Sequence, residues 1–334
     1  MIRQIIWLFC LLLIGCSQAE PVVIDVGRDV VQGVLLRTPE KAVFSVPADS
    51  ISAVVVTDSI LCLYYKKKQN ASYLILKDMG GTGERVPVQF GSAENQVLVA
   101  NYSFGNGKHL VYDPLLNKVG VVDIALAWSD SSYVPVFFKT NIVSQKVALM
   151  DDRLLYLNPD AYSPSQPHIL ISDAQWNCRH KEQNGHAALN VIGGEILYSS
   201  SNNKVAYCSR HEPMMELLDK ELHLLKQIWF PHQMGNIIEV LLEDNRVVYY
   251  YEGKAPECFT TAASNADYIA AVFWTDEKES IVFLFDWEGN IKDGFRTSGR
   301  VEKVSLTDIG DVAYCWETDG VESSLNEYKL YPNT

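Results

Sequence analysis

The stretch Ile281–Asn290 (IVFLFDWEGN) decides the fold, because a run of β-branched and aromatic residues is followed at once by a turn. Asp286 ends the apolar run, and Gly289 can take the positive φ that a tight hairpin needs. The same order of apolar strand, aspartate and turn recurs at Leu110–Asp113 and at Glu216–Asp219. The chain is therefore expected to be built from antiparallel hairpins.

Another strand precedes these hairpins, at Val97–Tyr102, Val205–Cys208 and Tyr268–Trp274. A unit of four short strands that returns about every 45–60 residues is typical of a propeller blade. A chance series of hairpins in a β-sandwich is the alternative that this spacing leaves open. In a propeller the first and last strands must meet, so Val22–Val26 is expected to pair with the strand that ends at Tyr328–Leu330.

Strand signals dominate the rest of the chain, and helical periodicity is scarce. The segment Met215–Leu225 fits either an amphipathic helix or two strands joined by a turn at Asp219–Glu221, and the recurring aspartate favours the hairpin. Further strands are predicted at Ala53–Val56, Ile60–Tyr65, Ile238–Leu242 and Val247–Tyr251.

The amino-terminal residues form a targeting signal. A basic start at Arg3 precedes the apolar run Ile5–Ile14, which as a helix would span roughly 15 Å, about half of a bilayer core. The run ends in Leu13–Cys16 (LIGC), which resembles the lipobox of bacterial lipoproteins. The resemblance implies that Cys16 is acylated by membrane lipid, palmitate included, after cleavage of the preceding peptide. An ordinary secretory signal with a chance cysteine is the alternative.

The signal sets the expected domain plan and location. Residues 1–15 are the lipoprotein signal peptide, 16–21 the lipidated tether and 22–334 a six-bladed propeller. Ser17 follows the acylated cysteine, and by resemblance to the sorting rule of Gram-negative lipoproteins this favours the outer membrane, with its periplasmic and surface faces both open.

Two stretches resemble the six-bladed β-propeller lipoproteins of Gram-negative bacteria, described as TolB-like or NHL-like. Lys77–Glu84 resembles their glycine-rich G-x-G-P-x-E segment, although Thr82–Gly83 replaces Gly-Pro. Tyr268–Gly289 and the closing Tyr328–Leu330 follow the family's last blades. The resemblance implies an all-β fold of six four-stranded antiparallel blades, with no demonstrated enzymatic activity.

Composition limits the partners and the cysteine chemistry. A net charge of −13 and a lone basic run at Lys66–Lys68 argue against nucleic-acid binding. Five cysteines follow the tether without any C-x-x-C spacing, which favours buried thiols and leaves one or two disulfides open. They are Cys62, Cys178, Cys208, Cys258 and Cys315.

No motif predicts a catalytic residue, a metal ligand or a cofactor. Gly80–Gly83 lacks the Lys-Ser/Thr of a phosphate-binding loop and is interpreted as a turn between blades. Cys178, His180 and His186, with Glu182 between them and His211 later, lack a second ligand pair at zinc spacing. They are interpreted as polar loop residues.

The ligand-binding residues are unknown from the sequence, and two function classes stay open. The first is a monomeric binding module of the cell envelope with a protein or glycan partner. The alternative is a carbohydrate-active or other envelope enzyme with acidic residues in the propeller funnel. Aromatic residues near strand ends would either line the propeller mouth or, as we favour, wedge between blades; they are Trp128, Trp176, Trp229, Trp274, Tyr133 and Tyr162.

Overall fold

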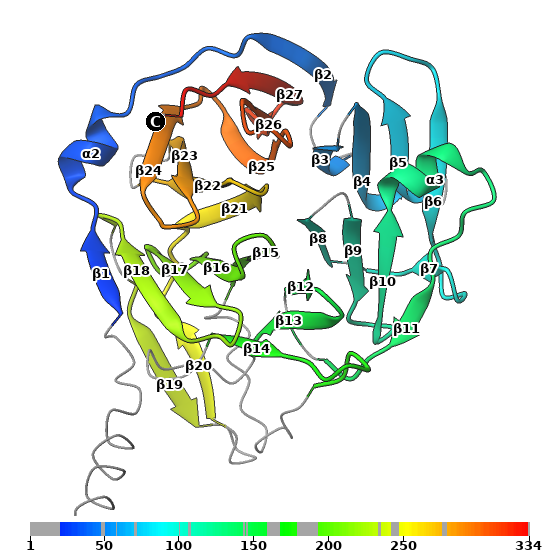
Figure 1. Cartoon of the computed structure of the whole chain (residues 1–334), viewed down its shortest axis with the longest axis horizontal. Helices are drawn as coiled ribbons and strands as arrows, with labels where there is room; N and C mark the ends of the chain where they lie inside the picture. Colours follow the sequence, from blue (N-terminus) through cyan, green and yellow to red (C-terminus); the bar gives the residue numbers. More distant parts are fainter. Residues whose placement is uncertain are drawn as a thin grey trace, which may run out of the picture.

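Six small antiparallel sheets stand around a central axis in the computed structural model of the chain, and each first strand faces that axis (Figure 1). The structure describes residues 21–332 except 48–50, 58, 70–71, 100, 106–107, 143, 145, 159–167, 179–192, 233–234, 242–246 and 276–278. The fold is an all-β six-bladed propeller, as predicted. The signal peptide, Cys16 and the tether up to residue 20 lie outside the described residues, so their assignment stays a prediction.

Each blade is a run of consecutive strands, and the first five blades follow one another along the chain. Blade 1 comprises β3 (Ile51–Thr57), β4 (Ile60–Gln69), β5 (Ser72–Asp78), β6 (Glu84–Phe90) and β7 (Gln96–Val97). Blade 2 comprises β8 (Asn101–Gly105), β9 (Lys108–Asp113), β10 (Lys118–Asp123) and β11 (Phe137–Lys139), with helix α3 (Ile124–Ser129) before its last strand. Blade 3 comprises β12 (Val147–Met150), β13 (Arg153–Leu157) and β14 (Ile169–Ile171). Blade 4 comprises β15 (Gly194–Ser199), β16 (Lys204–Ser209), β17 (Met214–Asp219) and β18 (Leu224–Trp229). The hairpin β19 (Ile237–Leu241) and β20 (Val247–Tyr251) follows, and then blade 5 with β21 (Phe259–Ser264), β22 (Tyr268–Trp274), β23 (Ser280–Asp286) and β24 (Ile291–Arg296).

Blade 6 closes the ring with strands from both ends of the chain. Its strands are β25 (Arg300–Leu306), β26 (Val312–Thr318), β27 (Glu322–Lys329) and, on the outside, β2 (Lys41–Pro47), antiparallel to β27. The predicted closure by Val22–Val26 is therefore wrong. Strand β1 (Val22–Asp25) instead pairs in parallel with β18 at the outer edge of blade 4. A strand-like sequence does not by itself select its partner, and residues 26–40 carry the chain past blade 5 before it pairs.

We call residues 22–47 the strap, because they run along the outer edges of blades 4, 5 and 6 (Figure 1). Between its two strands lies helix α2 (Arg28–Gly33), and Leu36 forms a single parallel bridge with Arg296 of blade 5. The strap thus ties three blades together outside the ring.

The apolar core is divided among the blade interfaces. The described residues form six buried clusters, and each lies between two neighbouring blades. The cluster between blades 6 and 1 contains Trp316, a large and fully buried side chain. Because burial of apolar area is the main stabilising force in folding, this seam helps to hold the two ends of the sheet array together.

The aspartate turns are confirmed, with a difference in their placement. The Asp286 carboxylate accepts hydrogen bonds from the amides of Glu288 and Asn290, and Gly289 has φ +77°. The carboxylates of Asp113 and Asp219 cap their turns in the same way. However, Asp219 and Asp286 end the third strand of their blades, whereas Asp113 ends the second strand. The three turns are similar in chemistry but do not mark equivalent positions of a repeat.

Three other local predictions can be compared with the structure. Met215–Leu225 is a hairpin between β17 and β18, as favoured. Gly80–Gly83 lies between β5 and β6, so it is a turn within blade 1. The prediction that it connects two blades is wrong. The strand predicted at Val97–Tyr102 is interrupted, because β7 ends at Val97 and β8 begins at Asn101.

No described helix is both long and apolar enough to cross a membrane.

Candidate functional site

A cavity of about 330 Å³ lies where the first strands of several blades approach one another. Tyr102 of β8, Glu195 of β15 and Lys303 of β25 line it, together with Lys146, which directly precedes β12. Residues of β3 and β21 line it as well, so all six blades contribute to one small space near the propeller axis. We call it the central cavity.

Two lysines share a single carboxylate in this cavity. The Nζ atom of Lys146 lies 2.5 Å from Glu195 Oε2, and Nζ of Lys303 donates a hydrogen bond of 2.7 Å to Glu195 Oε1. Lys146 also donates to the carbonyl oxygen of Tyr102 at 2.7 Å. The side chains of the three charged residues are only 10–13% exposed, so the interactions take place largely out of water.

Burial and mutual attraction act on these groups in opposite directions. Burial lowers the pKa of Lys146 to about 8, although the Glu195 carboxylate opposes the change. For Lys303 burial would also lower the pKa, but the attraction of Glu195 outweighs it and raises the pKa above its ordinary value. Burial would raise the pKa of Glu195, and the two ammonium groups outweigh it and lower the pKa. Glu195 is therefore ionised at neutral pH.

An arginine-centred group borders the same cavity. Arg300 contacts Glu257 at 3.1 Å and Glu302 at 3.0 Å, and its guanidinium lies 4.8 Å from the ring centre of Trp274. Arg210 contacts the other oxygen of Glu257 at 3.2 Å. Burial would raise the pKa of Glu257, but Arg300 and Arg210 outweigh it, so the pKa of this carboxyl is also lowered.

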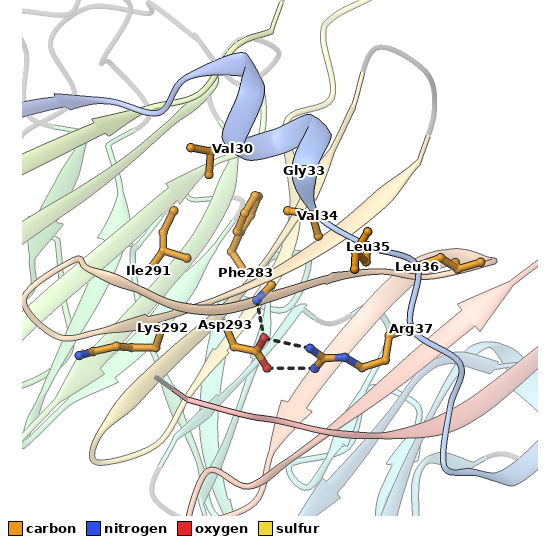
Figure 2. Close-up of a pocket in the computed structure, with 11 residues that line it drawn as sticks. Val30, Gly33, Val34, Leu35, Leu36, Arg37, Phe283, Ile291, Lys292 and Asp293 are labelled. Carbon is orange, nitrogen blue, oxygen red and sulfur yellow. Dashed lines mark hydrogen bonds and ion pairs between the residues drawn. The ribbon is translucent and has the colours of Figure 1, made fainter. Parts of the chain in front are cut away.

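A second hollow, of about 510 Å³, lies on the outer rim between the strap and β24 (Figure 2). Arg37 of the strap closes one end of it by a two-pronged ion pair with Asp293, both hydrogen bonds being 2.9 Å long. Leu35 and Leu36 on the strap are exposed beside it. The ion pair and the Leu36–Arg296 bridge hold the strap against blade 5, and the rim hollow between them offers an apolar surface to the outside.

The predicted polar-loop cluster is only partly described. His180, Glu182 and His186 lie outside the described residues, as does Tyr162. Cys178 lies within hydrogen-bond distance of Tyr156 at 3.1 Å, and His211 Nδ1 lies 2.8 Å from the carbonyl oxygen of Pro256. The structure places Cys178 in the connection after β14 and His211 between β16 and β17.

All five described cysteines are reduced thiols, and the four buried ones agree with the favoured interpretation. Burial raises the pKa of the Cys62, Cys208 and Cys315 thiols above the ordinary value. Cys258 is fully buried, and Cys178 is partly exposed. Raised pKa values keep thiols protonated, and protonated thiols are poor nucleophiles.

The described aromatic residues mostly pack between blades, as favoured. Trp128 and Tyr133 pack on the cluster between blades 1 and 2, Trp176 on that between blades 2 and 3, and Trp229 on that between blades 3 and 4. Trp274 is the exception, because Arg300 at the central cavity lies over its ring.

Sequence reasoning missed the central cavity, although a weak signal exists. Lys146, Glu195 and Lys303 each stand directly before an apolar residue in the first strand of a blade: Val147, Ile196 and Val304 in that order. A charged residue at the inner strand of several blades points toward the propeller axis. The signal becomes visible only once the blade boundaries are known.

Comparisons with known proteins support the fold. No known family and no curated protein matches this sequence. A solved structure of a Bacteroides fragilis protein assigned as exported is similar over 93% of this chain and 100% of its own, at 10% identity and a TM-score of 0.53. The Pan2 WD40 domain of Neurospora crassa matches 90% of this chain and 100% of its own, at 9% identity and a TM-score of 0.46. The first likeness agrees with a propeller and concerns the fold alone.

Proposed function

We propose that this chain is a lipid-anchored protein of the bacterial cell envelope whose propeller works as a binding module for a protein or glycan partner. The anchor is acylated Cys16 at the end of Leu13–Cys16, and Ser17 favours the outer membrane. The similar Bacteroides fragilis protein was assigned as exported, which agrees with a location outside the cytoplasm. Membership of the TolB-like lipoproteins is part of the same proposal.

One observation favours binding over catalysis in the central cavity. Glu195 is held between two ammonium groups, and the pKa values of Glu195 and Glu257 are both lowered. A glycosidase needs one carboxyl group with a raised pKa, so that it can give a proton to the leaving oxygen. Carboxylates fixed by cations instead make a rigid charged surface, which suits recognition of a ligand.

The anchor is tested by feeding the native host a palmitate analogue that can be labelled. The wild-type protein is expected to carry the label and to fractionate with membranes, whereas Cys16→Ala carries none. Cys10→Ala, a change inside the predicted signal peptide, is the matched control and should be labelled like the wild type. Label on Cys16→Ala, or none on the wild type, would contradict the anchor.

The binding role is tested separately by cross-linking and capture from membranes of the host. If the propeller makes the contacts, the wild type and Cys16→Ala should capture the same envelope partner. A partner that is captured only by the lipidated form would mean that the lipid, and not the propeller, is responsible. Turnover of an envelope glycan by the purified chain would favour the enzymatic alternative.

A further inference from the structure

The charges of the central cavity do not balance. Its cations are Lys146, Arg210, Arg300 and Lys303, and the carboxylates that contact them are Glu195, Glu257 and Glu302. The whole chain carries a net charge of −13, so a positive excess at its axis runs against the overall composition. Buried charges are costly unless they are paired, and this excess therefore calls for an explanation.

The excess is located at the lysine pair. Arg300 contacts two carboxylates, and one of these is shared with Arg210, so the arginine group is balanced. Among the described residues, Glu195 is the one carboxylate that forms ion pairs with Lys146 and Lys303, and it contacts both. An ammonium group has three N–H donors, and among the described residues Lys303 Nζ donates one hydrogen bond, to Glu195.

An aromatic ring and a small volume complete the surroundings of the lysine pair. The ring centre of Tyr102 lies 5.4 Å from Lys303 Nζ and 5.9 Å from Lys146 Nζ, so an aromatic face backs both ammonium groups. A volume of about 330 Å³ lies near the lower end of the range for small-ligand sites, about 300–1,000 Å³. It can hold one charged group with its immediate neighbours, such as an acidic side chain or a chain terminus.

We propose that the central cavity binds an oxyanion group of the ligand, a carboxylate or a phosphate, at Lys146 and Lys303, in competition with Glu195 for the two ammonium groups. This site deepens the proposed binding function and rests on it. Charge-assisted hydrogen bonds from two fixed lysines provide the affinity, and the small cavity selects a single anionic group.

Titration calorimetry of the full-length protein with two probes, N-acetylglycine and inorganic phosphate, tests the site and separates the two sources of the oxyanion. Lys303→Gln is expected to weaken binding of the preferred probe at least about tenfold, which is about 1.4 kcal/mol. Lys303→Arg should keep most of the affinity. Lys220→Gln removes an exposed lysine in a hairpin turn and is the matched control, so it should bind like the wild type.

A second variant distinguishes an anion site from simple damage to the fold. Glu195→Gln removes the competing carboxylate and should tighten probe binding, whereas a merely structural role for Glu195 predicts weaker binding. Affinity should also fall as the pH rises through about 8, where Lys146, which faces Glu195, Lys303 and Tyr102, loses its proton.

Three results would overturn the inference: no binding of either probe, equal affinity of the wild type and Lys303→Gln, or weaker binding by Glu195→Gln with its fold intact. None of them bears on the envelope capture experiment. A partner captured by a protein without this anion site would leave the binding module standing and remove only its proposed chemistry.

Discussion

A buried histidine between blades 1 and 2 makes the stability of this propeller sensitive to acid. His109 is 1% exposed; its Nδ1 lies 2.6 Å from the hydroxyl of Tyr64, and its Nε2 lies 3.1 Å from that of Thr57. Burial lowers its pKa from 6.5 to about 3. The folded protein thus keeps His109 neutral at a pH where the unfolded chain takes up a proton. The contribution of neutral His109 to the stability is therefore fully present above pH 6.5 and is lost as the pH falls below that value.

The size of the effect follows from the two pKa values. One pKa unit is worth about 1.4 kcal/mol, so His109 should lower the free energy of unfolding by about 3 kcal/mol between pH 7 and pH 4. His109→Gln cannot titrate and can still bond to one hydroxyl. We expect it to cost about 1–3 kcal/mol at pH 7 through lost packing and hydrogen bonding, and to remove most of the acid-dependent loss.

Urea unfolding followed by tryptophan fluorescence at pH 7, 6, 5 and 4 measures, for each variant, the free energy of unfolding at pH 7 and its decrease in acid. Carboxylates titrate over the same range, so the quantity of interest is the difference in pH dependence between the wild type and His109→Gln. His223→Gln, at an exposed hairpin position where the ring contacts Asp219, is the control, and its curve should stay much closer to that of the wild type than the curve of His109→Gln does. Parallel curves for the wild type and His109→Gln would show that this histidine is not the acid-sensitive group.

Three further outcomes are expected from chemical unfolding of single variants. Arg37→Ala removes the ion pair with Asp293 at the strap and should cost about 2 kcal/mol; an unchanged midpoint would mean that the strap is held by its strands alone. For His168, burial would lower the pKa, but two nearby carboxylates outweigh it and raise it, so its stabilisation is present below about pH 6.5 and is lost as the pH rises through the raised pKa. His168→Gln should therefore destabilise more at pH 6 than at pH 9, and the reverse order would contradict this sign. Gly289→Ala places a Cβ at positive φ and 2.9 Å from two apolar side chains, and it should cost about 1–2 kcal/mol more than Gly320→Ala, which has open space; equal losses would show that the hairpin moves aside.

Local chemistry made much of the fold predictable. Strand propensity at Ile281–Phe285, a carboxylate at Asp286 and a glycine at position 289 act within ten residues, so they can be read from the sequence directly. The hairpin at Met215–Leu225 was predictable for the same reason. The number of blades came from the resemblance to six-bladed propellers, and the length and pitch of such units agree with it.

Contacts between distant segments were not predictable in this way. Val22–Asp25 and Lys41–Pro47 are both strand-like, and the choice of ring-closing strand depends on which edge each reaches after the ring has formed. The central cavity could not be predicted from the sequence for the same reason. Lys146, Glu195 and Lys303 come from three blades, and a lone charge in an apolar strand gives no sign of its partner.

The path of the strap also has a mechanical consequence. A pull on the amino end, along the strand, first loads β1, whose hydrogen bonds to β18 then share the force instead of opening one at a time. The contacts of Arg296 with Val31, Val34 and Leu36, followed by the ion pair between Arg37 and Asp293, are the next points of resistance. Only after all of these have yielded does tension arrive at β2, the strand that seals the ring. The pairing of β1 with blade 4 and the Arg37–Asp293 ion pair therefore bear the load first, and the ring keeps its shape while the amino-terminal segment is under tension.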